Sequence, residues 1–188
     1  MHLNNVLIYL IGYPGVGKLT TAKALCSIAG MTLVDNHLAN TPIFKIIGAD
    51  GVTPIPEAAW DRVERVRDIL FDTILHVAPR HTSFVLTNVL LDGRGDRTLF
   101  NRVKELAEER SSLFVPVILN CEEEVLCRRI VSPGRVENMK LTKISSVIKL
   151  MQEQPLLSIV HPNLLVLDNT RLAAESSAAS ILEHIQSR

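Results

Sequence analysis

Short runs of consecutive apolar residues alternate along this chain with longer segments in which apolar residues recur every three or four positions. A continuous apolar run is typical of a strand buried on both faces of a parallel sheet, whereas the longer spacing is typical of a helix with one buried face. The apolar runs are residues 6–11, 31–34, 83–87, 113–120 and 164–168. Their alternation with helical segments predicts an α/β fold with three layers, α/β/α, around a parallel sheet of five strands.

The longest helical segment is predicted over residues 57–77. Its apolar stripe consists of Trp60, Val63, Val66, Leu70, Ile74 and Val77. The opposite face consists of Asp61, Arg62, Glu64, Arg65, Arg67 and Asp68. We interpret this charged face as solvated and not as a phosphate site.

Prolines and one aspartate set the expected limits of other elements. Residues 36–51 favour a short helix broken at Pro42, which either walls a substrate pocket or simply connects two elements. Pro116 is expected at the entry of the fourth strand, because proline removes a donor from the ladder. Asp96 is the expected N-cap of the helix that follows the third strand.

Composition and charge narrow the class of protein. The chain has 188 residues, of which 47% are hydrophobic, and its 20 basic and 20 acidic residues give no net charge. We therefore expect a single domain over residues 1–188, without a general attraction to nucleic acid or to anionic membranes. The three scattered cysteines favour a reducing compartment, and no apolar run approaches the roughly 20 residues of a membrane span. Together with the absence of a signal peptide pattern, these features predict a cytoplasmic protein.

A glycine-rich loop follows the first apolar run and precedes a helical segment. Its sequence is Gly12-Tyr13-Pro14-Gly15-Val16-Gly17-Lys18-Leu19-Thr20. Strand, glycine loop and helix form the context of a P-loop, in which backbone N–H groups and one lysine bind the phosphates of a nucleotide. Leu19 stands where Ser or Thr usually contacts Mg²⁺, so Thr20 is the nearest hydroxyl and would reach the metal through water.

Polar residues at the ends of the next two strands are candidates for the acceptor side of the same site. Asp35 ends the second strand, and ligands in open α/β sheets bind outside the carboxyl ends of the strands. It is either an acid that accepts a proton from the substrate or a turn residue. His37 and Asn88 could line the acceptor pocket. Residues 131–141, which contain breakers and charges, are interpreted as a lid.

In their order and spacing, these features resemble the P-loop small-molecule kinases, the group of shikimate kinase, gluconate kinase, chloramphenicol phosphotransferase and adenylate kinase. The resemblance implies a P-loop NTPase fold with the strand order 2-3-1-4-5. It also implies ATP and Mg²⁺ as cofactors. The residues that it places on the nucleotide are Gly12, Pro14, Gly15, Val16, Gly17, Lys18, Leu19, Thr20, Arg129 and Asn169.

The resemblance also assigns roles in phosphoryl transfer. Lys18 stabilises charge on the β and γ phosphates, Arg135 reaches the phosphates from the lid, and Asp35 accepts or orients the substrate hydroxyl. Arg129 would stack on the adenine, although a cation near a helix C-terminus also has a structural explanation. Asp35, His37, Asn88 and Arg94 are the residues expected to contact the substrate.

The expected function is transfer of the γ-phosphoryl group of ATP to a hydroxyl of a small molecule. A nucleoside monophosphate kinase is an alternative, and residues 91–94 resemble part of an adenylate kinase motif, but its Pro-Arg is missing. An ATPase without a small acceptor is a second alternative. It would require an acid at the tip of the third strand, where Asn88 stands instead. Neither nucleic acid nor membrane is expected as a partner.

Overall fold

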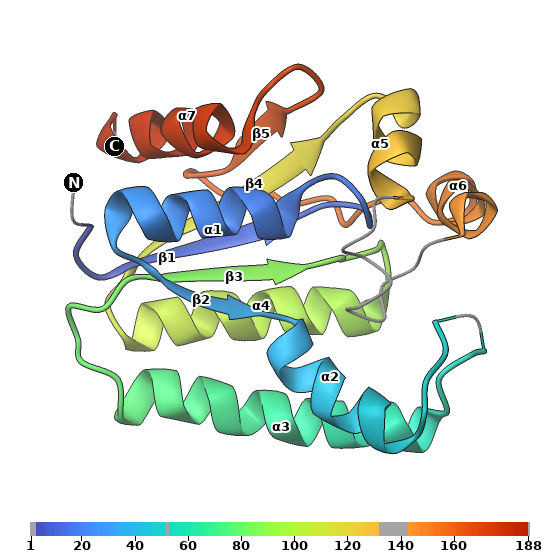
Figure 1. Ribbon diagram of the computed structural model, residues 1–188. Coiled ribbons are helices and arrows are strands. Elements are labelled where there is room, and N and C mark those ends of the chain that lie inside the picture. Colours follow the sequence, from blue (N-terminus) through green and yellow to red (C-terminus); the bar gives the residue numbers. More distant parts are fainter. Residues whose placement is uncertain (1–2, 52, 132–142, 188) are drawn as a thin grey trace.

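The computed structural model of the protein describes residues 3–51, 53–131 and 143–187. The sheet contains β1 (Val6–Ile11), β2 (Thr32–Asp35), β3 (Phe84–Asn88), β4 (Leu113–Asn120) and β5 (Leu165–Asp168). The strands pair in parallel in the order β2-β3-β1-β4-β5 (Figure 1). The predicted fold class and strand order are confirmed, and the strand limits differ from the predicted ones by at most one residue.

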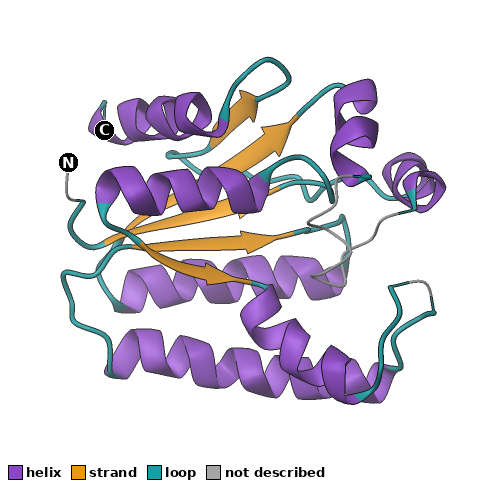
Figure 2. Ribbon diagram, viewed as in Figure 1, coloured by secondary structure: helices purple, strands orange, loops and turns teal. Residues whose placement is uncertain are grey.

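Helices cover both faces of this sheet (Figure 2). They are α1 (Lys18–Ala29), α2 (His37–Ile46), α3 (Glu57–His76), α4 (Arg94–Glu109), α5 (Glu123–Ile130), α6 (Ile144–Glu153) and α7 (Ala174–Gln186). Helices α1 and α7 lie on one face, and α3 and α4 lie on the other (Figure 1). Among the described residues, no helix combines the length and the apolar character that a membrane crossing requires.

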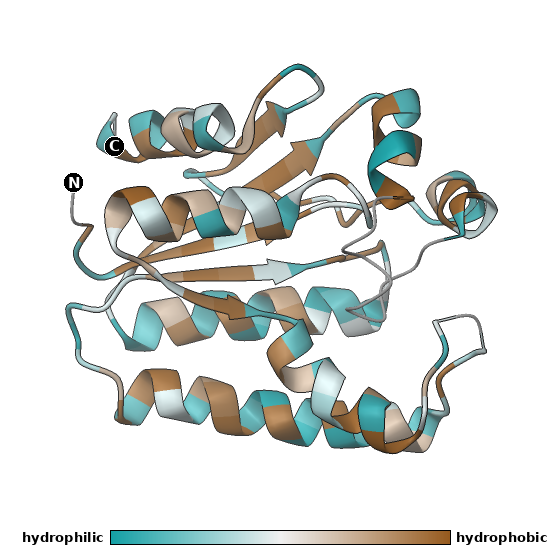
Figure 3. Cartoon of the chain, in the orientation of Figure 1, coloured by the Kyte–Doolittle hydropathy of each residue, from teal (hydrophilic) through white to brown (hydrophobic). Residues whose placement is uncertain are grey.

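The central strand β1 explains why the apolar runs are continuous. Ile8 and Leu10 pack into the core with α1 and α7, whereas Leu7, Tyr9 and Ile11 pack into the core with α3 and α4. Because successive side chains of a strand point to opposite faces, a strand with a core on each side is apolar at every position. Figure 3 shows the result, with strands that are largely brown between helices of mixed colour.

Three local expectations were wrong. Pro42 lies inside α2, which continues through it to Ile46 although one backbone hydrogen bond is lost. Pro116 lies in the middle of β4, aligned with Tyr9, one residue before β4 begins to pair with β5. Helix α4 begins at Arg94 with Gly93 as its N-cap, so Asp96 lies in the first turn. The Oδ2 atom of Asp96 accepts a hydrogen bond from the N–H of Leu91, in the preceding loop, at 2.7 Å.

Candidate active site

The glycine-rich loop connects the carboxyl end of β1 to the N-terminus of α1, as the sequence predicts. Gly17 is the N-cap of α1, whose first turn contains no acidic residue, so the positive end of the helix dipole faces the loop without compensation. A side chain at Gly12 would place its Cβ 2.6 Å from the carbonyl oxygen of Leu119, and Gly15 has a φ of +94°. The loop therefore requires glycine at both positions, and its backbone can bind an anion closely.

Lys18 folds back across this loop. Its Nζ donates to the carbonyl of Gly12 at 2.6 Å and to that of Tyr13 at 3.0 Å. These bonds hold the ammonium beside the N-terminus of α1, so that two sources of positive charge meet at one place. A phosphate oxygen bound there would be stabilised by both.

Arg129 and Asn169 hold the P-loop from the other side. Nη1 of Arg129 donates to the carbonyl of Val16 and to Oδ1 of Asn169, both at 3.0 Å, and Nη2 donates to the Asn169 carbonyl at 3.1 Å. Nδ2 of Asn169, a residue only 3% exposed, donates to the same Val16 carbonyl at 2.8 Å. Both residues were predicted to contact the nucleotide. The structure places both at the cavity and gives them a second task, which is to position the loop.

Thr20 and Leu19 both line the cavity. The hydroxyl of Thr20 donates to the Gly17 carbonyl at 3.0 Å and is otherwise exposed. Within residues 3–51, 53–131 and 143–187, His, Cys, Asp and Glu side chains form no group of three that could hold a metal ion. Thr20 and Asp35 are oxygen-bearing side chains of the lining, and oxygen is the ligand atom that Mg²⁺ prefers.

Asp35 lies at the carboxyl end of β2 and is 8% exposed. Its Oδ1 accepts the N–H of His37, the first residue of α2, at 2.6 Å. The turn role considered above is therefore present. Asp35 also lines the cavity, which leaves its chemical role as a prediction.

One cavity of about 1460 Å³ joins these groups at the carboxyl edge of the sheet. The predicted residues that line it are Pro14, Gly15, Gly17, Lys18, Leu19, Thr20, Asp35, His37, Asn88, Arg94, Arg129 and Asn169. Gly12 and Val16 are buried and do not belong to the cavity lining. Arg135, and all of the predicted lid except Val131, lie outside the described residues.

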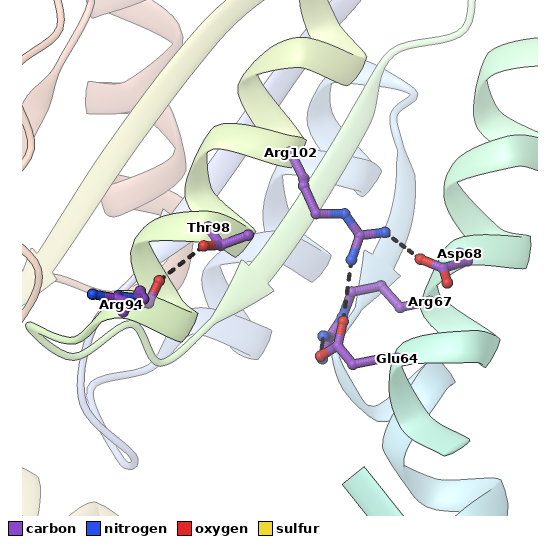
Figure 4. Close-up of polar contacts among 6 residues, drawn as sticks. All are labelled: Glu64, Arg67, Asp68, Arg94, Thr98 and Arg102. Atoms are coloured by element: carbon purple, nitrogen blue, oxygen red, sulfur yellow. Dashed lines mark hydrogen bonds and ion pairs between the residues drawn. The ribbon is translucent and has the colours of Figure 1, made fainter. Parts of the chain in front are cut away.

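The sequence analysis missed an ionic cluster of the cavity that joins α3 to α4 (Figure 4). Glu64 pairs with Arg67 and with Arg102, and Arg102 pairs also with Asp68. Arg67 is only 8% exposed, so its assignment to a solvated face was wrong. A signal was present, because Arg67 follows the buried Val63 by four residues and thus falls at the edge of the apolar stripe.

Helices α2 and α3 contribute an aromatic pair that was not singled out either. Phe44 and Trp60 meet edge to face, with ring centroids 5.3 Å apart, and both line the cavity. Asp96 lies in the same lining, and burial raises the pKa of its carboxyl above the ordinary value. These residues line the same cavity as the P-loop.

No protein-family model matches the sequence, and a search of curated proteins finds no match. Solved structures do match. A sugar kinase from Janibacter sp. aligns with a TM-score of 0.65 and 18% identity over 97% of this chain and 95% of its own. A gluconokinase from Sinorhizobium meliloti aligns with a TM-score of 0.61 and 14% identity, covering 99% and 94%. Shikimate kinase from Acinetobacter baumannii, in complex with shikimate, aligns with a TM-score of 0.55 and 18% identity, covering 98% and 94%. The chain therefore has the fold of the P-loop small-molecule kinases.

Proposed function

We propose that this protein transfers the γ-phosphoryl group of ATP to a hydroxyl of a small molecule. One observation carries the proposal: Lys18 with the P-loop, and Asp35, line the same cavity from the carboxyl ends of two parallel strands. A candidate anion-binding loop and a carboxylate thus line one space that is large enough for a small molecule. The structural neighbours that are kinases of a sugar, gluconate and shikimate agree with this assignment.

The chain's residues divide the work of phosphoryl transfer. The amides of the P-loop and the ammonium of Lys18 bind the triphosphate and stabilise the charge that develops on its leaving end. Asp35 orients the acceptor hydroxyl and takes its proton as the hydroxyl oxygen bonds to the γ-phosphorus and the bond to the bridging oxygen breaks, leaving ADP. Mg²⁺, when bound, neutralises charge on the phosphate oxygens. Arg129 and Asn169 keep the loop in place, and Arg135 stays a proposed phosphate contact.

A nucleoside monophosphate kinase is the second candidate, and one observation favours it. Arg67, Arg94 and Arg102 line the half of the cavity that faces the P-loop, and a phosphate-bearing acceptor needs cations there. The pairing of Arg67 and Arg102 with Glu64 weighs against this candidate.

The test separates nucleotide binding from chemistry with two variants. Lys18→Ala should weaken binding of Mg-ATP, measured by calorimetry, because the loop loses its charged donor. Asp35→Asn should keep nucleotide affinity and lower phosphoryl transfer from labelled ATP to a pool of small hydroxylated metabolites by about 10²–10⁴-fold. Asp92→Asn, at an exposed residue outside the cavity lining, is the matched control. Transfer at the wild-type rate by Asp35→Asn would contradict the proposal, as would ATP hydrolysis that no acceptor changes.

A further inference from the structure

The half of the cavity opposite the P-loop is formed by the ends of β2 and β3 and by residues of α2, α3 and α4, and we call it the acceptor wall. Its charged residues balance in sign. Arg67, Arg94 and Arg102 are the cations, and Asp35, Glu64 and Asp96 are the anions. The P-loop half differs, because Lys18 and the N-terminus of α1 meet there with no acidic residue in the first turn of the helix.

Two of the three cations of the acceptor wall are also engaged in ion pairs. Arg67 and Arg102 share the carboxylate of Glu64, and Arg102 reaches Asp68 as well. Arg94 is exposed and lies apart from this cluster in Figure 4. A phosphate or carboxylate bound at Arg67 or Arg102 would share these guanidinium groups with the carboxylates of Glu64 and Asp68, whose negative charge repels it. The electrostatics of the wall therefore favour an acceptor without net charge.

An aromatic surface stands beside this neutral lining. Trp60 is 42% exposed although it is the largest side chain of the wall, and Phe44 packs against it edge to face. An aromatic face that lines a cavity and remains accessible can bind the carbon-rich face of a ring by dispersion and apolar burial. A flat ring covers more of such a face than a flexible polar chain does.

Asn40 provides a polar group next to this surface. It lies on α2 one turn before Phe44, so the two side chains occupy the same helix face. Asn40 lines the cavity and is only 7% exposed, yet its Oδ1 has no hydrogen-bond partner among the described residues. A buried amide oxygen without a partner is costly, which is the pattern of a group that a ligand satisfies.

We propose that the phosphoryl acceptor is a neutral, ring-bearing molecule with several hydroxyls. Its ring lies on Trp60 and Phe44, one hydroxyl meets Asp35, and another polar hydrogen is bound by the amide of Asn40. This inference rests on the proposed function and names the class of substrate that the same site takes. A sugar carrying an aromatic or apolar substituent has these properties.

The chain contains its own reporter, since Trp60 is its single tryptophan. The probes are phenyl β-D-glucopyranoside, phenyl β-D-glucuronide, which differs by one carboxylate, and methyl β-D-glucopyranoside, which lacks the aromatic ring. Titration with Mg²⁺ and a non-hydrolysable ATP analogue present should change Trp60 emission most with the phenyl glucoside. We expect this probe to bind at least about 5-fold tighter than either of the others.

Variants on one helix locate the effect. Phe44→Leu and Asn40→Ala should each weaken binding of the phenyl glucoside by about 5-fold or more, with the reporter intact. Ile46→Ala, on the same helix but 83% exposed and outside the cavity lining, should leave it unchanged. Tighter binding of the glucuronide, or no change of emission with the phenyl glucoside, overturns the inference.

Phosphoryl transfer to the same probes, followed with labelled ATP, keeps the two proposals distinguishable. Transfer to the glucuronide in preference to the neutral probe preserves the proposed function and overturns the inference. Tight binding of the neutral probe without transfer preserves the recognition and contradicts the proposed function.

Discussion

The bond network between Asn169 and the P-loop is the feature whose removal should affect nucleotide binding most selectively. Asn169→Ala deletes the amide that donates to the Val16 carbonyl at 2.8 Å and accepts from Arg129 at 3.0 Å. Arg129 keeps its own bond to Val16 and its bond to the backbone carbonyl at position 169. The loop thus loses one of two anchors and retains the other.

The magnitude follows from the two bonds. A neutral hydrogen bond contributes about 1 kcal/mol net, and one from a charged donor about 1.5–3 kcal/mol. Because Arg129 retains both of its backbone partners, we expect the free energy of unfolding to fall by about 2 kcal/mol. If the whole loss makes the P-loop more mobile before ATP binds, ATP binding must order the loop again. The affinity of the variant for ATP then falls by up to about 30-fold.

Urea unfolding and calorimetric titration with Mg²⁺ and a non-hydrolysable ATP analogue measure the two quantities. Asn163→Ala is the matched control, since it removes one amide bond, to the Phe114 carbonyl at 3.0 Å, away from the cavity. The control should lose about 1 kcal/mol of stability and keep its affinity. The reasoning is refuted if Asn169→Ala loses stability and still binds the nucleotide as tightly as the wild type.

Three further outcomes follow from the structure. Arg110 is 1% exposed, and its guanidinium donates to backbone carbonyls at and beyond the end of α3. Arg110→Met should therefore lower the free energy of unfolding in urea by at least about 3 kcal/mol, and Arg110→Lys should lower it less. A loss below 1 kcal/mol for Arg110→Met would contradict this. Gly15→Ala places a Cβ 2.8 Å from Ile130 at a φ of +94° and should weaken ATP binding at least 10-fold. The control Gly48→Ala, at a φ of +65° in open space, should lose only about 1 kcal/mol of stability and keep its ATP affinity. Equal ATP affinities of the two variants would contradict this prediction. Burial lowers the pKa of His161 below its ordinary 6.5, so the stability that neutral His161 contributes is fully present above pH 6.5 and is lost as the pH falls through the folded pKa. His161→Gln should flatten this part of the plot of unfolding free energy against pH. An unchanged plot would exclude His161 as the cause.

The parts of the fold that sequence predicted correctly are those set by local pattern. The continuous apolar runs located the strands because the central strands have a core on both faces, as β1 shows. The P-loop was found because its glycines, lysine and flanking elements are contiguous. Pro116 was misplaced because β4 pairs with β1 from Leu113 onward, and local pattern does not specify this long-range pairing. Asp96 accepts a bond from the loop residue Leu91, and the N-cap position of α4 is taken by Gly93.

The acceptor wall was harder to predict because no contiguous motif encodes it. Arg67 was assigned to solvent from its charge, whereas the packing of α4 against α3 brings Arg102 to the Glu64 that it shares with Arg67. The contact of Phe44 with Trp60 joins two helices across a connecting loop. Each of these contacts depends on the path of the chain between elements, which periodicity does not specify.

This division has a physical consequence for how such a site can change. The P-loop follows β1, a central strand between β3 and β4. A Cβ at Gly12 would meet the Leu119 carbonyl, and Gly15 and Gly17 have positive φ, so substitutions there are costly. The acceptor wall follows β2, a four-residue strand at the sheet edge whose side chains are partly exposed, and α2 carries only two buried residues. Replacing Phe44, Trp60 or Asn40 therefore disturbs little of the core, and the acceptor can change while the nucleotide site and the fold stay the same.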